Sequence, residues 1–90
     1  MKISRLDGRQ RSKHAVMRRL ALDLDFPVHF SGNLDALFDV LTGDVKGPLT
    51  IHWRPTDRAR TTMGADYDRL VATLEDAARE RKDITLDLIA

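Results

Sequence analysis

Two aspartates four residues apart, Asp35 and Asp39, lie in a stretch that reads NLDALFDVLTG. A step of four residues turns an α-helix by about 40°, so both carboxylates would project from the same side of a helix. Two close carboxylates can work as a general acid and base, or they can attract a cationic partner. Residues 21–45 contain no lysine or arginine that would neutralise them. The pattern therefore predicts a negatively charged surface that its own segment leaves unbalanced.

The sequence lacks the residues that most enzymes and metal sites use. It has no cysteine, no G-x-S-x-G motif and no glycine-rich phosphate loop. A two-layer fold of 90 residues also leaves little room for a concave active site. His14, His29 and His52 do not have the i,i+3 or i,i+4 spacing of a helical metal site. We therefore expect no catalytic residue, no metal and no cofactor.

Charge is divided unevenly along the chain. Residues 1–20 hold seven basic residues and one acidic residue, residues 21–45 hold five aspartates and no basic residue, and the whole chain has a formal charge of +1. Asp39 lies toward the C-terminal end of its predicted helix and Asp44 lies just beyond that end, where the helix dipole opposes negative charge. Asp76 and Glu80 form a second acidic pair without a basic residue four positions away. These acids predict an external cationic partner.

The basic segment at residues 1–20 has no Phe, Tyr or Trp, so it lacks the aromatic rings on which single-stranded nucleic acid stacks. We expect it to form a solvated helix face that lies away from the acidic surface. The first ten residues contain no apolar segment typical of a signal peptide, and no apolar run reaches 18 residues. The sequence therefore predicts a cytoplasmic protein with no membrane partner and no direct nucleic-acid partner.

Hydrophobic periodicity predicts three strands separated by helices, in the order β-α-α-β-α-α-β. Asn33 is the expected N-cap of the second helix, and Gly43 is its expected left-handed C-terminal cap. Strands separated by helical crossovers are usually parallel. We therefore predict one α/β domain over residues 1–90, a two-layer fold in which helices pack on one face of a three-stranded parallel sheet. The expected strands are 2–6, 49–54 and 84–89, the expected helices are 13–24, 34–42 and 66–82, and residues 56–63 admit one or two helical turns.

Three stretches of the sequence resemble the barstar family, whose members are small cytoplasmic inhibitors of the secreted ribonuclease barnase. They are HFSGNLDALFDVLTG, PLTIHWR and ERKDITLDLI, and the similarity covers nearly the whole chain. The resemblance implies a three-stranded parallel sheet and a non-enzymatic function. It implies an intracellular inhibitor that occludes the active site of a microbial, barnase-type, guanyl-specific ribonuclease with acidic residues of the second helix and the loop before it.

Position by position, the resemblance assigns Asp39 to the phosphate site of the nuclease and Asp35 to an arginine at its rim. It assigns Asp76 and Glu80 to further acidic contacts at the rim. A ribonuclease active site is cationic because it holds phosphate, so carboxylates can substitute for the substrate. The partner-binding residues predicted in this way are His29, Phe30, Asn33, Asp35, Phe38, Asp39, Thr42, Gly43, Asp44, Asp76 and Glu80.

Three of these residues depart from the family pattern. His29 stands in place of a tyrosine, and Phe38 and Asp44 stand in place of tryptophans, which predicts a cognate nuclease with a differently shaped rim. We expect a protein that is monomeric when free and binds its partner one to one. The alternative is a protein-interaction module on the same fold with a different cationic protein partner. An RNA-binding role and an enzyme rank below it.

Overall fold

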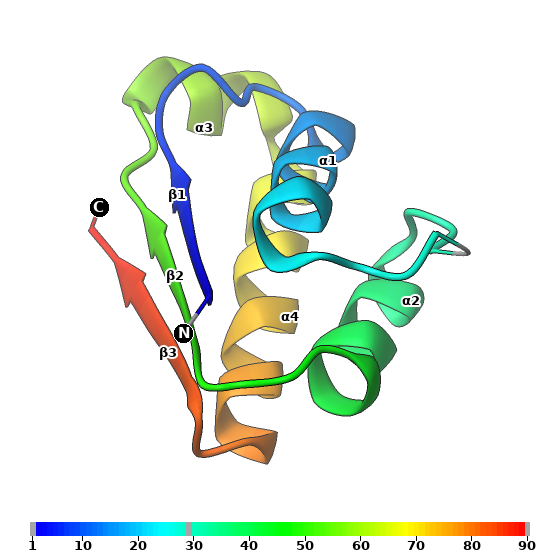
Figure 1. The fold of residues 1–90 in the computed structure, drawn as a ribbon. Coiled ribbons are helices and arrows are strands. Elements are labelled where there is room, and N and C mark those ends of the chain that lie inside the picture. The colour runs from blue at the N-terminus through cyan, green and yellow to red at the C-terminus, as the bar shows by residue number, and fades with distance from the viewer. Residues whose placement is uncertain (1, 29, 90) are drawn as a thin grey trace.

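Three parallel strands form one sheet in the computed structural model, which describes residues 2–28 and 30–89. The sheet order is β1-β2-β3, so the strands lie side by side in the order in which they occur in the chain. Their register aligns Arg5, His52 and Asp87 across the sheet. This topology confirms the predicted α/β class and the predicted order of elements. The strands are β1 (Lys2–Leu6), β2 (Leu49–Trp53) and β3 (Ile84–Leu88) (Figure 1).

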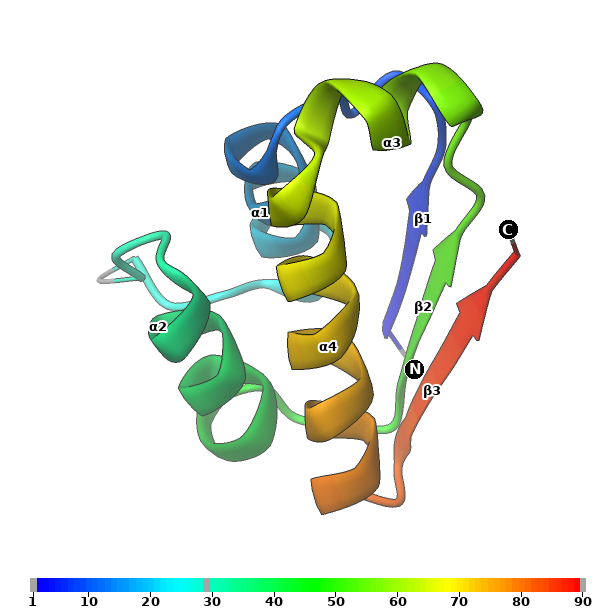
Figure 2. The same cartoon turned by 180° about the vertical axis from the view of Figure 1, so that it is seen from behind.

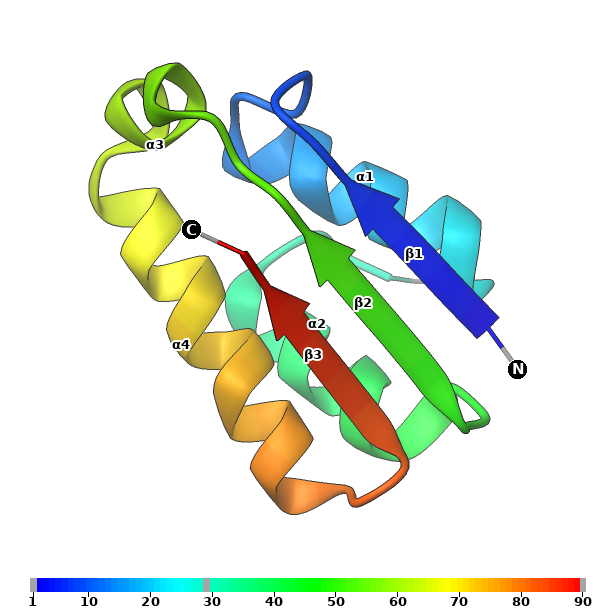
Figure 3. The same ribbon diagram turned by 90° about the vertical axis from the view of Figure 1, so that its left-hand side faces the viewer.

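The helical layer covers one face of the sheet and leaves the other face open (Figure 3). α1 packs on β1 and α4 packs on β3, whereas α2 packs on α4 and lies farther from the sheet (Figures 1 and 2). The second helix is therefore on the side of the molecule opposite the open face. The helices are α1 (Lys13–Leu24), α2 (Leu34–Asp39), the π-helical turn η1 (Val40–Asp44), α3 (Asp57–Met63) and α4 (Ala65–Glu80).

Alternation within the strands explains why one face of the sheet can stay open. In β2, Leu49, Ile51 and Trp53 are at most 1% exposed, whereas the side chain of His52 on the other face is 39% exposed. Parallel sheets that are buried on both faces usually lack such alternation. On the open face, His52 Nδ1 lies 2.9 Å from Asp87 Oδ2 on the neighbouring strand. The open face thus carries polar side chains and a polar cross-strand contact, which is compatible with its exposure to solvent.

The apolar sides of the helices and the inner face of the sheet together form one core. Burying a leucine side chain stabilises a fold by about 1.5–3 kcal/mol, so each buried member anchors its helix. Leu34 and Phe38 are partly buried and pack against this core. The buried members are Val16, Met17, Leu20 and Leu24 of α1, Leu37 of α2, Leu41 of η1, and Leu70, Leu74 and Ala77 of α4.

Several boundaries differ from the sequence predictions. α4 ends at Glu80, two residues before the predicted end, because the backbone of Arg81 is extended with φ −124° and ψ 122°. β2 and β3 are each one residue shorter than predicted. The ambiguous segment 56–63 forms α3, and the Thr56 side chain caps it by accepting a hydrogen bond from the Ala59 N–H at 3.1 Å. Within the described residues, no helix combines the length and the apolar character that a membrane crossing requires.

Candidate partner-binding site

The N-terminal end of α2 is fixed by Asn33. Its Oδ1 accepts a hydrogen bond from the Ala36 N–H at 2.7 Å, which confirms the predicted N-cap. Asp35 lies in the first turn, where negative charge is favoured by the helix dipole. Leu37 is fully buried on the core side of the helix. α2 is therefore capped at its start and anchored through Leu37, and this fixes the direction of its exposed carboxylates.

The C-terminal end of this helix does not form the predicted glycine cap. The chain continues from α2 into η1, in which the Val45 N–H donates to the Val40 carbonyl oxygen five residues earlier, at 3.0 Å. Because this wider turn ends at Val45 in an extended conformation, Gly43 stays inside η1 and does not have a positive φ. The prediction of a left-handed Gly43 is therefore wrong. Thr42 donates its hydroxyl to the Phe38 carbonyl oxygen at 2.8 Å, within the same helix.

Three exposed carboxylates, Asp35, Asp39 and Asp44, lie on α2 and η1. Within residues 2–28 and 30–89, none of them forms an ion pair. A shallow pocket of about 290 Å³ is lined by Asp39 and Asp44 together with Phe30 from the preceding loop. The structure thus brings an aromatic ring and two carboxylates together, and Asp35 lies outside the lining of this pocket.

Basic side chains of α1 lie next to this acidic pocket. A second pocket of about 340 Å³ is lined by His14 and Arg18 of α1 and by Phe30 and Ser31 of the loop before α2. The two pockets share Phe30 and Ser31. The expectation that the basic segment lies away from the acidic surface is therefore wrong for Arg18. A partner that covers both pockets would meet negative and positive charge side by side.

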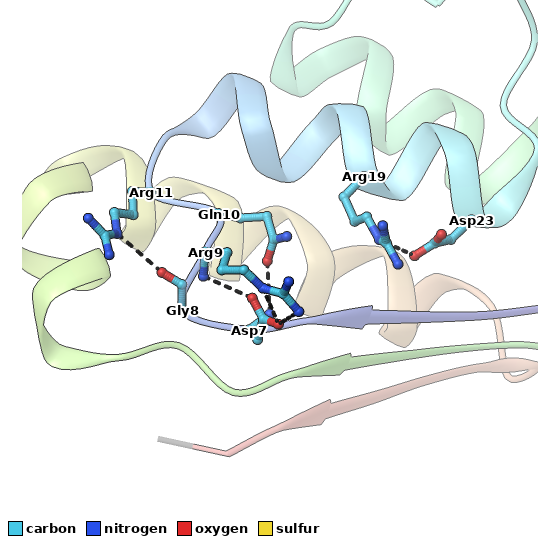
Figure 4. A network of polar contacts seen from close by, with 7 residues as sticks. All are labelled: Asp7, Gly8, Arg9, Gln10, Arg11, Arg19 and Asp23. Atoms are coloured by element: carbon cyan, nitrogen blue, oxygen red, sulfur yellow. Dashed lines mark hydrogen bonds and ion pairs between the residues drawn. The ribbon is translucent and has the colours of Figure 1, made fainter.

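Two other arginines of the N-terminal segment, Arg9 and Arg19, form ion pairs within the chain (Figure 4). Arg9 Nη2 lies 3.0 Å from Asp7 Oδ2, and Arg19 Nε lies 3.0 Å from Asp23 Oδ2. The hydrogen bond from the Arg9 side chain lowers the pKa of Asp7 below its usual value. These two arginines therefore stabilise the turn after β1 and the flank of α1, and each already has an internal carboxylate partner.

The second predicted acidic pair, Asp76 and Glu80 on α4, differs from the first. Asp76 forms an ion pair with Arg79 three residues later. It is therefore paired, although no basic residue lies four positions away from it. Glu80 is exposed and forms no ion pair within the described residues. Neither residue lines the pocket of Asp39 and Asp44. The two acids therefore lie on a neighbouring helix and outside that pocket.

Arg81 makes a contact that the sequence pattern does not reveal. Its side chain is 19% exposed, and Nη1 donates to the carbonyl oxygens of Leu41 at 2.8 Å and Val45 at 2.6 Å. Nε and Nη2 donate to the two carboxylate oxygens of Asp83 at 2.9 and 2.6 Å. The hydrogen bond from Arg81 lowers the pKa of Asp83. Because Arg81 and Leu41 are 40 positions apart, no local periodicity signals this contact.

The remaining predicted residues are placed as follows. Phe38 is partly buried and packs against the core, so much of its ring anchors α2. His29 lies outside the described residues. Within the described part of the chain, no group of three or more His, Asp or Glu residues is arranged to hold a metal ion.

Comparison with known proteins adds a family match to these features. The family model described as Barstar (barnase inhibitor) matches residues 1–89. A protein of Bacillus subtilis (strain 168) named "Putative ribonuclease inhibitor YrdF" is 37% identical over 79 residues. The aligned region covers 87% of this chain and 87% of that protein. The family match includes every strand and helix described above.

Proposed function

Because the chain belongs to the barstar family of ribonuclease inhibitors, we propose that it blocks the active site of a microbial, guanyl-specific ribonuclease with α2, η1 and the loop before them. Members of this family inhibit ribonucleases and are not themselves enzymes. One observation carries the proposal beyond family membership. Asp35, Asp39 and Asp44 are exposed, and no cation of the described chain forms an ion pair with them.

In this proposal the carboxylates take the place of substrate phosphate. A site that cleaves RNA binds phosphate with cationic side chains, and a carboxylate offers two oxygens that accept charge-assisted hydrogen bonds from arginine. We assign Asp39 to the phosphate site, as the resemblance to the barstar family implies, and its exposure in the pocket beside Phe30 supports this assignment. Asp35, one turn earlier, is assigned to an arginine at the rim. Glu80 and the paired Asp76 are assigned to weaker contacts at the rim.

The rigid mounting of α2 supports this assignment. A side chain that is already ordered in the free protein loses less conformational entropy on binding than a mobile one. The Asn33 cap and the buried side chains of Leu37 and Leu41 hold the helix on the body. We therefore assign to Asn33 an indirect role, in which its cap presents the first turn of α2.

Gly43 has no explanation within the described chain, and we assign it to the contact surface. Its φ is not positive, and a Cβ atom added there would have no neighbour within 4 Å. Neither backbone conformation nor a close intramolecular contact therefore requires glycine at this position. In the proposed complex, the absence of a side chain lets the ribonuclease approach the backbone of η1.

The surroundings of the acidic pocket suggest which nuclease would fit. Asp44 adds a negative charge to the pocket, and Arg18 adds a positive charge beside Phe30. We propose that the cognate ribonuclease has a cationic centre bordered by a neutral or acidic segment that faces α1. We further propose that the protein acts in the cytoplasm as a monomeric single domain and binds one nuclease molecule.

Titration of a purified, secreted guanyl-specific ribonuclease with the protein tests the proposal. Activity should fall to zero at one equivalent. Asp39→Ala should weaken inhibition by a factor of about 30 to several thousand, as expected when one partner of a buried charge pair is removed. That range includes measurements on the barnase–barstar pair itself, so it is carried over from the family.

Asp68→Ala is the matched control, because Asp68 is an exposed aspartate of α4 that forms no ion pair within the described residues. It should inhibit like the parent protein. Equal, small losses in the two variants would contradict the assignment of Asp39. If the parent protein left ribonuclease activity unchanged but bound another cationic protein through Asp39, the alternative of a different protein partner would replace this proposal.

A further inference from the structure

We propose that Arg81 is a positioning residue of the inhibitory surface. Its guanidinium holds the end of η1 against the body of the protein and so keeps Asp39 and Asp44 in place. Arg81 acts through the backbone of η1 and would not itself touch the ribonuclease. The inference rests on the proposed function, because it requires that this end of the helix meets the ribonuclease.

The contacts of Arg81 join segments that are distant in the sequence. Nη1 donates to the carbonyl oxygens of Leu41 in η1 and of Val45, the residue that follows η1, which precede Arg81 by 40 and 36 positions. Asp83 binds Nε and Nη2 with both of its carboxylate oxygens. A planar guanidinium with five N–H donors can serve carbonyls and a carboxylate at once, which a lysine ammonium cannot do with the same geometry.

The guanidinium also offsets negative charge in α2 and η1, which we together call the acidic helix. The last carbonyls of a helix carry partial negative charge, and Asp39 and Asp44 add two carboxylates at the same end. Neither α2 nor η1 has a basic residue in its last turn that would offset this charge. Arg81 supplies the missing cation from the segment after α4, and its ion pair is with Asp83. The helix end is thus stabilised while Asp39 and Asp44 stay available to a partner.

The loop before β2 leaves space for this arrangement because it contains Gly47. A Cβ atom added at Gly47 would lie 2.7 Å from Arg81 Nη2 and would collide with the carboxylate of Asp83. Glycine at this position therefore allows Arg81 and Asp83 to pair beneath the loop. We call Arg81, Asp83 and Gly47 the η1 clamp.

Amide hydrogen exchange in the free protein tests the η1 clamp without any ribonuclease. The Val45 N–H donates to the Val40 carbonyl oxygen, so its exchange reports the opening of η1. In Arg81→Ala it should exchange roughly 10- to 100-fold faster, the range expected for losing a hydrogen bond from a charged donor. The Phe26 N–H, which donates to the Ala21 carbonyl oxygen at the end of α1, should exchange at an unchanged rate.

Arg79→Ala is the matched control for this experiment. It removes the same charge two residues away, from a side chain that is 71% exposed and paired with Asp76. Exchange of the Val45 N–H should therefore stay at the parental rate. If Arg81→Ala also left this rate unchanged, the η1 clamp would be overturned.

Ribonuclease binding tests whether the η1 clamp serves the inhibitory surface. Arg81→Ala should bind about tenfold more weakly, because η1 must then be ordered at the moment of binding. The loss caused by Asp39→Ala should also be smaller in the Arg81→Ala background than in the parent protein. A residue that only stabilised the fold would leave the Asp39 effect unchanged, because both proteins are compared while folded.

Asp83→Asn is the milder variant for the case in which Arg81→Ala does not fold, and it should change exchange and binding in the same direction by smaller factors. Faster Val45 exchange combined with parental affinity and an unchanged Asp39 effect would overturn the positioning role. If the parent protein inhibited no ribonuclease, the proposed function would fail and the positioning role with it. The exchange measurement would then still decide separately whether Arg81 orders η1.

Discussion

Two pairs of carboxylates with the same i,i+4 spacing, Asp35 with Asp39 on α2 and Asp76 with Glu80 on α4, differ in their surroundings. No basic residue lies in the segment 21–45 that contains the first pair. On α4, Arg79 lies one turn from Asp76 and forms an ion pair with it. Because the spacing of the acids is identical, the comparison teaches that the neighbouring cations decide whether a carboxylate is available to a partner.

The ends of the two helices differ in the same way. α4 has Arg79 in its own last turn, where a cation is favoured by the helix dipole. The acidic helix has no such residue, and Arg81 from the segment after α4 binds the carbonyl oxygens of Leu41 and Val45 instead. The acidic helix thus depends on a distant part of the chain for the charge that α4 supplies itself.

Neutralising the two pairs separately should produce the largest difference. Asp35→Asn with Asp39→Asn should weaken ribonuclease inhibition by roughly 100-fold or more, because it removes the Asp39 charge that becomes buried in the complex as well as the Asp35 charge at the rim. Asp76→Asn with Glu80→Gln changes the net charge by the same amount, so long-range attraction is matched. It should weaken inhibition by about fivefold or less, as expected for exposed charges at a rim. If both double variants lost inhibition by similar factors, the carboxylates of the two helices would not differ in their contribution to binding.

Adding one methyl group to the acidic helix should have the next largest effect. Gly43→Ala should leave stability unchanged or raise it by about 0.5–1 kcal/mol, because alanine is favoured over glycine in a helical turn. It should weaken binding about tenfold if the backbone of η1 meets the partner closely. Urea unfolding and inhibition titrations measure the two quantities.

Gly64→Ala is the contrasting variant, because Gly64 has a φ of +57° that alanine adopts only with strain. It should lower stability without lowering the affinity of the folded protein. If Gly43→Ala bound the ribonuclease as tightly as the parent protein does, η1 would not be part of the contact surface.

Removing Arg79, the cation that pairs with Asp76, should have a small effect of opposite sign on ribonuclease binding. Arg79→Ala releases Asp76 and makes the net charge more negative, so association with a cationic ribonuclease should become up to about twofold faster at low salt. Stopped-flow association rates at two ionic strengths measure this, and the gain should disappear at high salt. A slower association would mean that Arg79 itself contacts the partner.

The paired carboxylates should also respond to acid. The hydrogen bond from Arg81 lowers the pKa of Asp83 below its ordinary value of 3.8. The ion pair therefore stabilises the folded protein above pH 3.8, and this stabilisation is lost as the pH falls through the lowered pKa. Asp83→Asn should therefore be less stable than the parent protein near pH 7. The difference should shrink when unfolding is measured below pH 3.8. A difference that did not depend on pH would show that the charge of Asp83 is not what stabilises the η1 clamp.

Local patterns determined most of the fold. Strand alternation in LTIHW placed Leu49, Ile51 and Trp53 on one face, and this is the face that the helices cover. The cap at Asn33 could also be predicted, because its side chain accepts a hydrogen bond from the amide three residues later. These features depend on residues within one turn of each other, so the sequence alone specifies them. The exposure of Asp35 and Asp39 follows from the same periodicity.

Only the tertiary structure decided what surrounds the acidic helix. The wide turn of η1 kept Gly43 out of a left-handed conformation, and the packing of α1 brought Arg18 next to Phe30. The contact between Arg81 and Leu41 joins positions 40 residues apart and arises because the end of α4 lies beside the end of η1. Helical periodicity fixes which side of a helix is apolar, but the identity of its neighbours depends on how the helices pack.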